Sequence, residues 1–440
     1  MVRGGFKETH GGVLATHMWK GVRLPRMLPP GSIRPDYEGN CLSNVPSTAL
    51  TLLGKRSNRP TLSHDALEGV ETSGAENVIL MVCDGLGMNE WLRKPATGFF
   101  GTLSKKGAVK PITTVFPSTT AAAVTTVSTG LTPQEHGLPE WYVYMEELGE
   151  VVVALPFTRV GERGTDTLKG ILPAKTLIDD TTIFQQAGDG VSCTSFVSRG
   201  LAKTVYTRVS RAGSEVSPYT TSSDLAVSLR RHVEKARGKN LIYVYWSYVD
   251  TIEHIYGPGT DEAYVETSLI SHALQEGFLG KLDREAAKRT LVILTADHGQ
   301  LRVQPENTLY MNRWGKLKRS LRKSPKGKPI PPWGSARDAY LAIEEGKVDE
   351  TKAYLQERLD GVATVMETEE AIRDGLFGIN KPSKRFRRRV GDLMILPHDN
   401  KTVWYRYAEG DALSLRGHHG GLAQEEMTIP LAAARLSDLG

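Results

Sequence analysis

Short apolar runs that alternate with helix-like segments constrain the fold of this chain more than any other feature. The clearest run is Asn77-Val-Ile-Leu-Met-Val-Cys83. Further runs lie at residues 151–155, 191–197, 241–246 and 290–295. A continuously apolar strand suits the interior of a parallel sheet that is covered on both faces. We therefore predict an α/β fold, a three-layer sandwich with a central, mostly parallel sheet.

Segments with helical periodicity separate these runs. We expect one helix that is capped by Ser223-Asp224 and extends to Lys235, and another over residues 261–275. The Ser/Thr-rich segment 116–130 predicts a helix of about three turns that Gly130 ends.

Changes in composition and periodicity along the chain predict three structural regions. Residues 1–45 lack periodicity and are punctuated by proline, so we expect a poorly structured N-terminal arm. Residues 46–304 and 391–440 are predicted to form the core. Residues 305–390 are predicted to form a small α+β insertion, with a mobile basic loop in the Lys/Arg/Pro-rich stretch 316–332.

Composition excludes several classes of protein. The chain has 440 residues, with 55 basic and 50 acidic side chains and a net charge of +5, which is too balanced to indicate nucleic-acid binding. Its three cysteines form neither a CxxC motif nor a disulfide framework. No run has the length of a membrane span, and no secretory apolar stretch follows the N-terminal Met. We expect a cytoplasmic protein that binds neither membrane nor nucleic acid; the sequence indicates no oligomeric state.

Four short segments place metal-ligand residue types directly after predicted strands. They are Asp84-Gly-Leu-Gly, Asp250-Thr-Ile-Glu-His254, Asp297-His298-Gly299 and Gly417-His418-His419-Gly420. Open α/β folds bind ligands at the carboxyl ends of their strands. Asp250 and His254 are four residues apart and share one face of a helical turn, and Gly299 allows a bend after His298.

Each segment has a plain structural interpretation, such as a carboxylate that caps a turn or a solvated helix start. Together, however, they supply hard oxygen donors and borderline nitrogen donors from distant parts of the chain. That combination predicts two divalent ions, with Zn²⁺ first and Mn²⁺ or Mg²⁺ as alternatives.

The helix predicted within residues 116–130 adds a hydroxyl group to this chemistry. A hydroxyl at a helix start lies in the positive field of the helix dipole, where a phosphate also binds. Ser118 or Thr119 can simply cap the helix, but we favour one of the threonines as a nucleophile.

The order of these segments resembles the alkaline phosphatase superfamily, and most closely its type I phosphodiesterase/nucleotide pyrophosphatase branch, over residues 77–304 and 386–435. The resemblance implies that Thr120, ten residues before Gly130, is the nucleophile. It assigns one ion to Asp250, His254 and His419. It assigns the second ion to Asp84, Asp297, His298 and the Thr120 oxygen. His419 is preferred over His418 because of the family's GxHG pattern.

Two further positions are compared with the family. The motif Pro133-Gln-Glu-His136-Gly-Leu matches it, and the resemblance implies that His136 is not a ligand. Family members carry an Asn soon after this motif that binds a phosphate oxygen, whereas this chain has Glu140 followed by Trp141.

The resulting prediction is a two-metal hydrolase of phosphodiester or pyrophosphate bonds that acts on a small phosphoester or nucleotide through a covalent Thr120 intermediate. A phosphomonoesterase and a phosphoglycerate-mutase-like phosphotransferase remain open as alternatives. A different class is a polyanion binder that uses the basic stretches 316–328 and 385–389, but solvated surface loops of a slightly basic protein are the favoured explanation of these stretches. A pseudoenzyme is disfavoured because all seven expected site positions are present.

Overall fold

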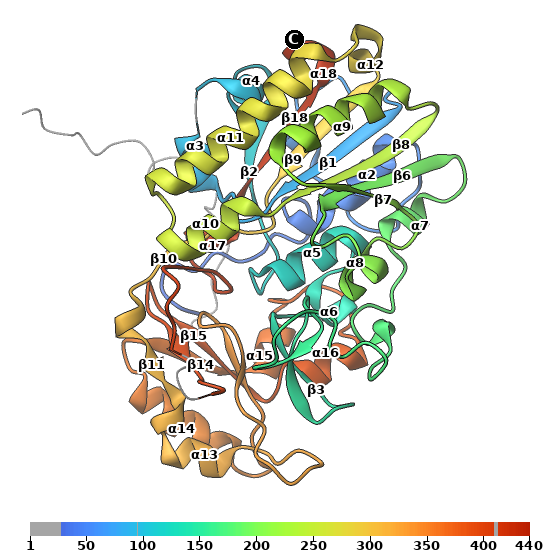
Figure 1. Cartoon of the computed structure of the whole chain (residues 1–440). Helices are drawn as coiled ribbons and strands as arrows, with labels where there is room; N and C mark the ends of the chain where they lie inside the picture. Colours follow the sequence, from blue (N-terminus) through green and yellow to red (C-terminus); the bar gives the residue numbers. More distant parts are fainter. Residues whose placement is uncertain (1–27, 95, 409–411) are drawn as a thin grey trace, which may run out of the picture.

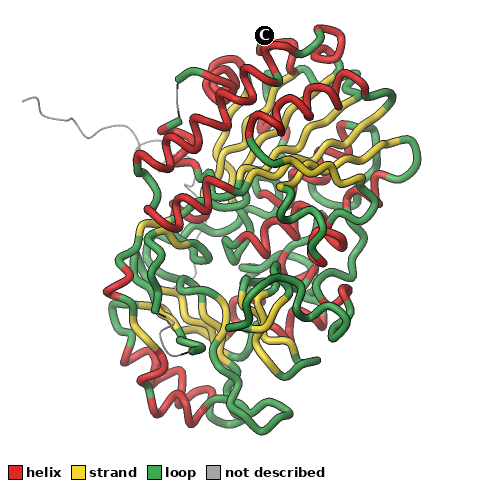
Figure 2. Tube along the Cα trace, in the orientation of Figure 1, coloured by secondary structure: helices red, strands yellow, loops and turns green. Residues whose placement is uncertain are grey.

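A computed structural model describes residues 28–94, 96–408 and 412–440. The described chain forms two lobes, each built on a seven-stranded sheet (Figures 1 and 2). None of its helices in these ranges combines the length and the apolar character that crossing a bilayer would require.

The larger lobe contains the predicted sheet, with strand order β2-β18-β9-β1-β8-β6-β7. Its strands are β1 (Asn77–Cys83), β2 (Ala108–Thr113), β6 (Val191–Ser198), β7 (Glu215–Tyr219), β8 (Lys239–Trp246), β9 (Thr290–Thr295) and β18 (Thr428–Arg435). β1 lies between β8 and β9, parallel to both, and all seven of its residues are buried. β18 runs antiparallel to both of its neighbours. The predicted α/β class with a mostly parallel central sheet is confirmed.

Helices form a layer on each face of this sheet (Figure 1). On one side lie α4 (Gly98–Lys106), α9 (Ser222–Lys235), α11 (Asp261–Gly277), α12 (Arg284–Lys288) and α18 (Leu436–Leu439). On the other lie α2 (Val45–Leu52), α5 (Thr120–Thr129), α7 (Ile183–Ala187) and α8 (Val205–Ser210). The predicted helices α9 and α11 are present, but the side chain that caps α9 is Thr221, which accepts a hydrogen bond from the Asp224 amide.

The smaller lobe contains an antiparallel sheet with strand order β14-β15-β13-β12-β3-β4-β5. Its strands are β3 (Tyr142–Met145), β4 (Glu150–Val153), β5 (Thr158–Arg159), β12 (Trp333–Gly334), β13 (Ala339–Leu341), β14 (Ala363–Glu367) and β15 (Leu393–Pro397). Five helices belong to this lobe: α6 (Pro133–His136), α13 (Gly315–Ser320), α14 (Val348–Arg358), α15 (Thr368–Arg373) and α16 (Lys384–Arg389).

The remaining helices and strands are short. They are α3 (Met88–Arg93), α10 (Tyr248–Tyr256), α17 (Gln424–Met427), the pair β10 (Leu301–Arg302) with β17 (Gly417–His418), and the pair β11 (Leu309–Tyr310) with β16 (Val403–Trp404). Six short 3₁₀ turns complete the described elements: η1 (Leu42–Asn44), η2 (His64–Leu67), η3 (Ala174–Thr176), η4 (Leu279–Lys281), η5 (Pro305–Asn307) and η6 (Met311–Arg313).

The smaller lobe is not identical to the expected insertion at residues 305–390. Its sheet also takes β3, β4 and β5 from residues 142–159 and β15 from residues 393–397, which were both expected in the core. The apolar run at 151–155 was expected in the parallel sheet, but β4 forms an antiparallel hairpin with β3 instead. The turn between the two strands is short enough for the hairpin to form locally, and an apolar run alone does not distinguish the two kinds of sheet.

Two segments that were expected to be loose are packed where the structure describes them. Residues 1–27 of the expected arm lie outside the described residues, but residues 28–45 contribute Tyr37, Cys41 and Leu42 to the main core. The basic stretch 316–332 was expected to be mobile. It contains α13, and its apolar residues Leu317, Leu321 and Ile330 are buried. Lys and Arg side chains between these anchors reach solvent, so a basic composition does not by itself make a loop free.

Two glycines, Gly87 and Gly299, allow the loops after β1 and β9 to approach each other closely. A Cβ atom added to Gly299 would lie 2.9 Å from the Cα of Gly87 and even closer to the Glu425 carbonyl oxygen. Both neighbours are backbone atoms, which cannot move aside as a flexible side chain can. The close approach of these loops brings the residues that follow β1 and β9 together.

Gly299→Ala is therefore expected to lower the free energy of unfolding by about 1–3 kcal/mol, because the added methyl overpacks a backbone contact. The matched control is Gly200→Ala, where an added Cβ meets no atom within 4 Å. Its effect should stay below about 1 kcal/mol. Chemical denaturation of both variants measures the difference, and equal stability of the two would contradict the proposed contact.

Candidate active site

The carboxyl edge of the main sheet brings three aspartates together. Asp84 follows β1, Asp250 lies in the first turn of α10 after β8, and Asp297 follows β9. The Asp250 amide donates to the Asp84 carbonyl oxygen (3.0 Å), and the Gly85 amide donates to Asp297 Oδ1 (3.1 Å). Because β1, β8 and β9 are neighbours in the sheet, the residues that follow them lie close to one another at its carboxyl edge.

The segment at residues 417–421 reaches the same edge through Ser118. The Ser118 hydroxyl donates to the Gly421 carbonyl oxygen (2.7 Å) and accepts from the Gly420 amide (3.1 Å). The Ser118 carbonyl oxygen lies 3.0 Å from His419 Nδ1. Ser118 precedes α5 by two residues, so these contacts hold His419 beside Thr120, the first residue of that helix.

Three histidines turn Nε2 toward this centre, because Nδ1 of each lies close to a backbone carbonyl oxygen. The Nδ1 atom of His254 lies 2.7 Å from the Gly417 carbonyl oxygen, that of His298 3.2 Å from the Gly299 carbonyl oxygen, and that of His419 3.0 Å from the Ser118 carbonyl oxygen. A carbonyl oxygen can only accept, so each Nδ1 carries the proton and each Nε2 keeps its lone pair. Histidines that bind metals are oriented in this way.

The side chains fall into two groups of potential metal ligands. Asp250, His298 and His419 form one group, and Asp84, Asp297 and His298 form the other, with the ligand atoms of each group within 4.8 Å of one another. His298 thus belongs to both groups, whereas the family resemblance assigned it to the second ion alone. His254 belongs to neither, although its Nε2 lies 3.3 Å from Asp250 Oδ1.

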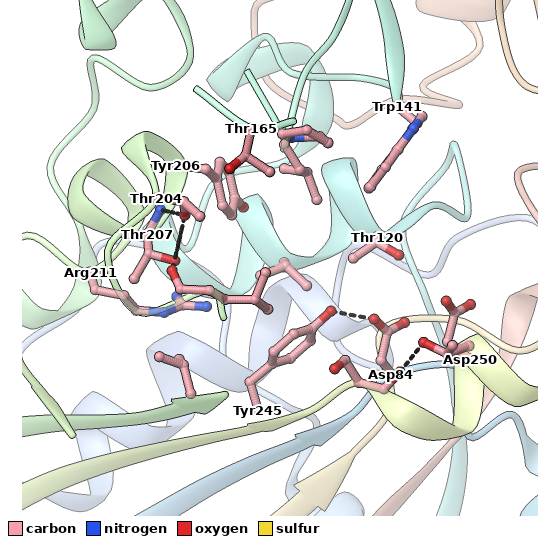
Figure 3. Close-up of a pocket in the computed structure, with 17 residues that line it drawn as sticks. Asp84, Thr120, Trp141, Thr165, Thr204, Tyr206, Thr207, Arg211, Tyr245 and Asp250 are labelled. Atoms are coloured by element: carbon pink, nitrogen blue, oxygen red, sulfur yellow. Dashed lines mark hydrogen bonds between the residues drawn. The ribbon is translucent and has the colours of Figure 1, made fainter. Parts of the chain in front are cut away.

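Thr120 lies at the centre of this arrangement. Its hydroxyl oxygen is 3.0 Å from His298 Nε2, and His298 Nε2 is 3.5 Å from Asp84 Oδ1. Figure 3 shows Thr120 facing Asp84 and Asp250 across the end of a pocket. No side chain caps α5, and the amide groups in its first turn have no acceptor within the helix.

The negative charges of the three aspartates repel one another. Burial, followed by the charges of Asp297 and Asp250, raises the pKa of Asp84 well above its usual range. Within the described ranges, Asp84 Oδ1 and Asp297 Oδ2 are buried without a hydrogen-bond partner. Burial and the neighbouring His298 and His254 hold the pKa of His419 well below its usual value, so its imidazole is neutral.

These features fit a divalent cation. The unpartnered carboxylate oxygens and the neutral Nε2 atoms are deprotonated donors of the kinds that Zn²⁺ and Mn²⁺ bind. A cation would also offset the mutual repulsion of the three carboxylates.

Two histidines near the site have other surroundings. His136 is buried against Thr126, 3.2 Å from its hydroxyl oxygen, and accepts from the Leu138 amide. His418 is also buried, and its pKa falls to about 3 because of burial and the nearby His254 and Arg337. Neither belongs to a group of potential ligands among the described residues.

The sequence did not reveal two residues that orient the carboxylates. The Tyr245 hydroxyl donates to Asp84 Oδ2, and the Gln300 amide donates to Asp250 Oδ1 (2.6 Å). Burial and the charges of Asp84 and Asp297 raise the pKa of Tyr245 well above its usual value, which keeps it a donor. Gln300 directly follows the Asp-His-Gly motif, so its position in the sequence is a signal. Tyr245 lies within the apolar run of β8, and its contact with Asp84 is evident only once β8 is paired with β1.

Two cavities meet at Thr120, Trp141 and Asp250. One, of about 290 Å³, extends toward α8 and is the pocket in Figure 3. The other, of about 400 Å³, extends toward the smaller lobe and is lined also by Glu140, Tyr142 and Trp404. Trp141 lines both cavities, so its side chain is part of the wall between them.

A buried carboxyl pair lies behind the second cavity. Burial and the charge of Asp338 raise the pKa of Glu140 well above its usual range, and burial raises the pKa of Asp338 to about 7. A Cβ added to Gly420, next to His419, would lie 2.9 Å from Asp338 Oδ1 and 3.3 Å from Glu140 Oε1. The pair thus holds a proton at neutral pH directly behind the histidine segment.

The sequence model of the type I phosphodiesterase/nucleotide pyrophosphatase family matches residues 78–422. The chain belongs to this family. The resemblance to the alkaline phosphatase superfamily is thereby confirmed, and the protein is a phosphoester hydrolase.

Solved structures share the fold at low sequence identity. Murine ectonucleotide pyrophosphatase/phosphodiesterase 5 is 20% identical with a TM-score of 0.59, over 81% of this chain and 87% of that chain. The human protein of the same name is 18% identical with a TM-score of 0.57, over the same shares. Phosphonoacetate hydrolase from Sinorhizobium meliloti, in complex with phosphonoformate, is 19% identical with a TM-score of 0.55, over 82% of this chain and 93% of that chain. A search of curated protein sequences finds no match.

Substitution of the adjacent histidines distinguishes a ligand from a neighbour. His419→Gln should weaken Zn²⁺ binding by at least about 10-fold, because it removes a neutral Nε2 donor that faces Asp250. His418→Gln, at the neighbouring buried position, should change the affinity far less. Calorimetric titration of metal-stripped protein with Zn²⁺ measures both, and the opposite order would reverse the choice between the two histidines.

The carboxyl pair predicts a pH dependence of stability. The folded protein holds protons that unfolded carboxyls release near pH 4, so the free energy of unfolding should fall as the pH rises from about 4 through about 7. Each pKa unit is worth about 1.4 kcal/mol.

Asp338→Asn should flatten this slope, whereas the exposed Asp349→Asn should leave it unchanged. Denaturant titrations at about pH 5 and about pH 8 compare the variants with the wild type. A slope that survives in Asp338→Asn would show that the pair does not contribute to it.

Proposed function

We propose that the protein is a two-metal phosphodiesterase or nucleotide pyrophosphatase that uses Thr120 as its nucleophile. The observation that carries this proposal is the position of the Thr120 hydroxyl, at the start of α5 and within 3.0 Å of the histidine that belongs to both ligand groups. A hydroxyl in that position can approach phosphorus while the substrate lies in either cavity.

The groups that would hold the metals are Asp84, Asp297 and His298 on one side, and Asp250, His419 and His254 on the other. When bound, divalent cations there would supply charge for the phosphoryl oxygens and lower the pKa of a neighbouring hydroxyl. Zn²⁺ is the first candidate because nitrogen and carboxylate donors are mixed, and Mn²⁺ or Mg²⁺ remain alternatives.

The protein residues perform the remaining tasks. Tyr245 and Gln300 hold Asp84 and Asp250 in orientation through their hydrogen bonds. The amides at the start of α5 would provide donors for a phosphoryl oxygen. The resemblance to the family assigns this task to an Asn side chain, and Trp141 has no side-chain amide. Attack by Thr120 would transfer the phosphoryl group to its oxygen and release the leaving group, and water would then regenerate the hydroxyl.

Ligands of the similar proteins support a small substrate. The murine phosphodiesterase 5 has been solved as an inactive variant in complex with AMP, and the bacterial hydrolase in complex with phosphonoformate and phosphonoacetate. We propose accordingly that a small phosphoester or nucleotide enters between the two lobes.

Thr120→Val should reduce kcat by about 10³-fold or more, because it removes the hydroxyl and keeps the shape of the side chain. The bound metal content should stay unchanged. Thr120→Ser is the matched control and should retain turnover, since it keeps the hydroxyl.

The assay uses bis-p-nitrophenyl phosphate and p-nitrophenyl phosphate with Zn²⁺ and with Mn²⁺. A preference for the monoester would favour the phosphomonoesterase alternative. Undiminished turnover by Thr120→Val on both substrates would refute Thr120 as the nucleophile.

A further inference from the structure

A buried arginine lies at the end of the first cavity, away from the candidate metal ligands. Arg211 follows the last residue of α8 and is only 4% exposed. One terminal nitrogen of its guanidinium donates to the Ser128 hydroxyl (2.6 Å) and to the Ser210 carbonyl oxygen (3.4 Å). Within the described ranges, its other nitrogens have no hydrogen-bond partner and no carboxylate forms an ion pair with it.

The guanidinium is held in place by rigid elements. It stacks on Tyr243 of β8, 3.9 Å from the ring centroid. Its hydrogen-bond partner Ser128 belongs to α5, the helix that begins at Thr120. Arg211 is thus attached to the same helix and the same strand that present Thr120 and Tyr245 at the site.

These attachments set the separation between the two ends of the cavity. Ser128 lies eight residues after Thr120, which corresponds to about 12 Å along a helix axis. Tyr243 lies two residues before Tyr245, which corresponds to about 7 Å along a strand. Figure 3 shows Arg211 and Asp250 at opposite sides of the pocket, with Tyr245 between them.

The cavity is chemically asymmetric. Asp84 and Asp250 line one end, whereas Arg211 is the one basic side chain among its lining residues. Thr207 lies one helical turn before Arg211 and also lines the cavity, with its hydroxyl oxygen 3.1 Å from that of Thr204. A fixed guanidinium is a donor group that suits an anion.

We propose that Arg211 forms a subsite for a second anionic group of the substrate, a carboxylate or a further phosphoryl group, at a distance from the reacting phosphorus. This inference rests on the proposed function, since Thr120 and the metal end must bind the first anionic group. A buried cation without a carboxylate partner is costly to maintain, and a ligand anion supplies the missing counter-charge. The subsite selects elongated substrates that have an anion at each end.

The subsite can be tested by binding alone, with two series of phosphonates that differ only in a terminal carboxylate. The probes are ω-carboxyalkylphosphonates of increasing chain length and the alkylphosphonates of the same lengths, titrated calorimetrically into Zn²⁺-saturated protein. In the wild type, the carboxylate should increase affinity by about 10- to 100-fold at the best chain length, as expected for hydrogen bonds to a charged group.

Arg211→Met should abolish this gain and leave alkylphosphonate binding unchanged, and Arg211→Lys should keep part of it. The control is Arg208→Met, an exposed arginine on the same helix, which should behave as the wild type. A loss of affinity for both series in Arg211→Met, with a lower Tm, would show a structural role and overturn the subsite.

Equal affinity of the two series for the wild type would also overturn the subsite, while the proposed function would stand. Failure of both series to bind the wild type would overturn the proposed function and the subsite with it.

Discussion

Repulsion between buried carboxylates is the physical constraint on which this site depends. An aspartate lies shortly after each of three neighbouring parallel strands of one sheet, and the pairing of the strands brings the three side chains together. Asp84 and Asp297 are buried, so water screens their charges poorly. The surrounding histidines are oriented with their lone pairs inward, which makes the centre a place for a cation rather than for a further hydrogen-bond network.

The rest of the molecule maintains this concentration of charge. Gly87 and Gly299 allow the two loops after the central strands to touch, and Ser118 ties the start of α5 to the histidine segment. The ion pair between Arg337 and Glu426 is buried beneath that segment, where Glu426 also accepts from the Gly421 amide. The smaller lobe thus supports the histidines from behind, and the larger lobe supplies the aspartates and Thr120.

Two cavities that share one reacting end give the site room for different substrates. The cavity toward the smaller lobe is walled by aromatic side chains, whereas the cavity toward α8 ends at a fixed cation. Trp141 borders both cavities.

The residues at the strand ends could be predicted because their placement is local: an apolar strand, a turn and a polar residue follow one another in the chain. Asp84, Asp250 and Asp297 were identified in this way, and so was the helix that begins near Thr120. Partners from distant segments could not be found by the same reasoning. Tyr245 is one aromatic residue in an apolar strand, and Arg211 is one arginine near a helix end, until the sheet register and the packing of α8 give each its neighbour.

The sequence by itself determined the class of fold, the family and the stock of donors, because hydrophobic periodicity and motif order are local properties of a chain. Only the tertiary structure decided which donors meet. It placed His298 between both groups of carboxylates, moved the run at 151–155 into a second sheet, and buried the anchors of the basic stretch. Such outcomes depend on contacts between residues hundreds of positions apart, whose energies are set by burial and by neighbouring charges that no local pattern encodes.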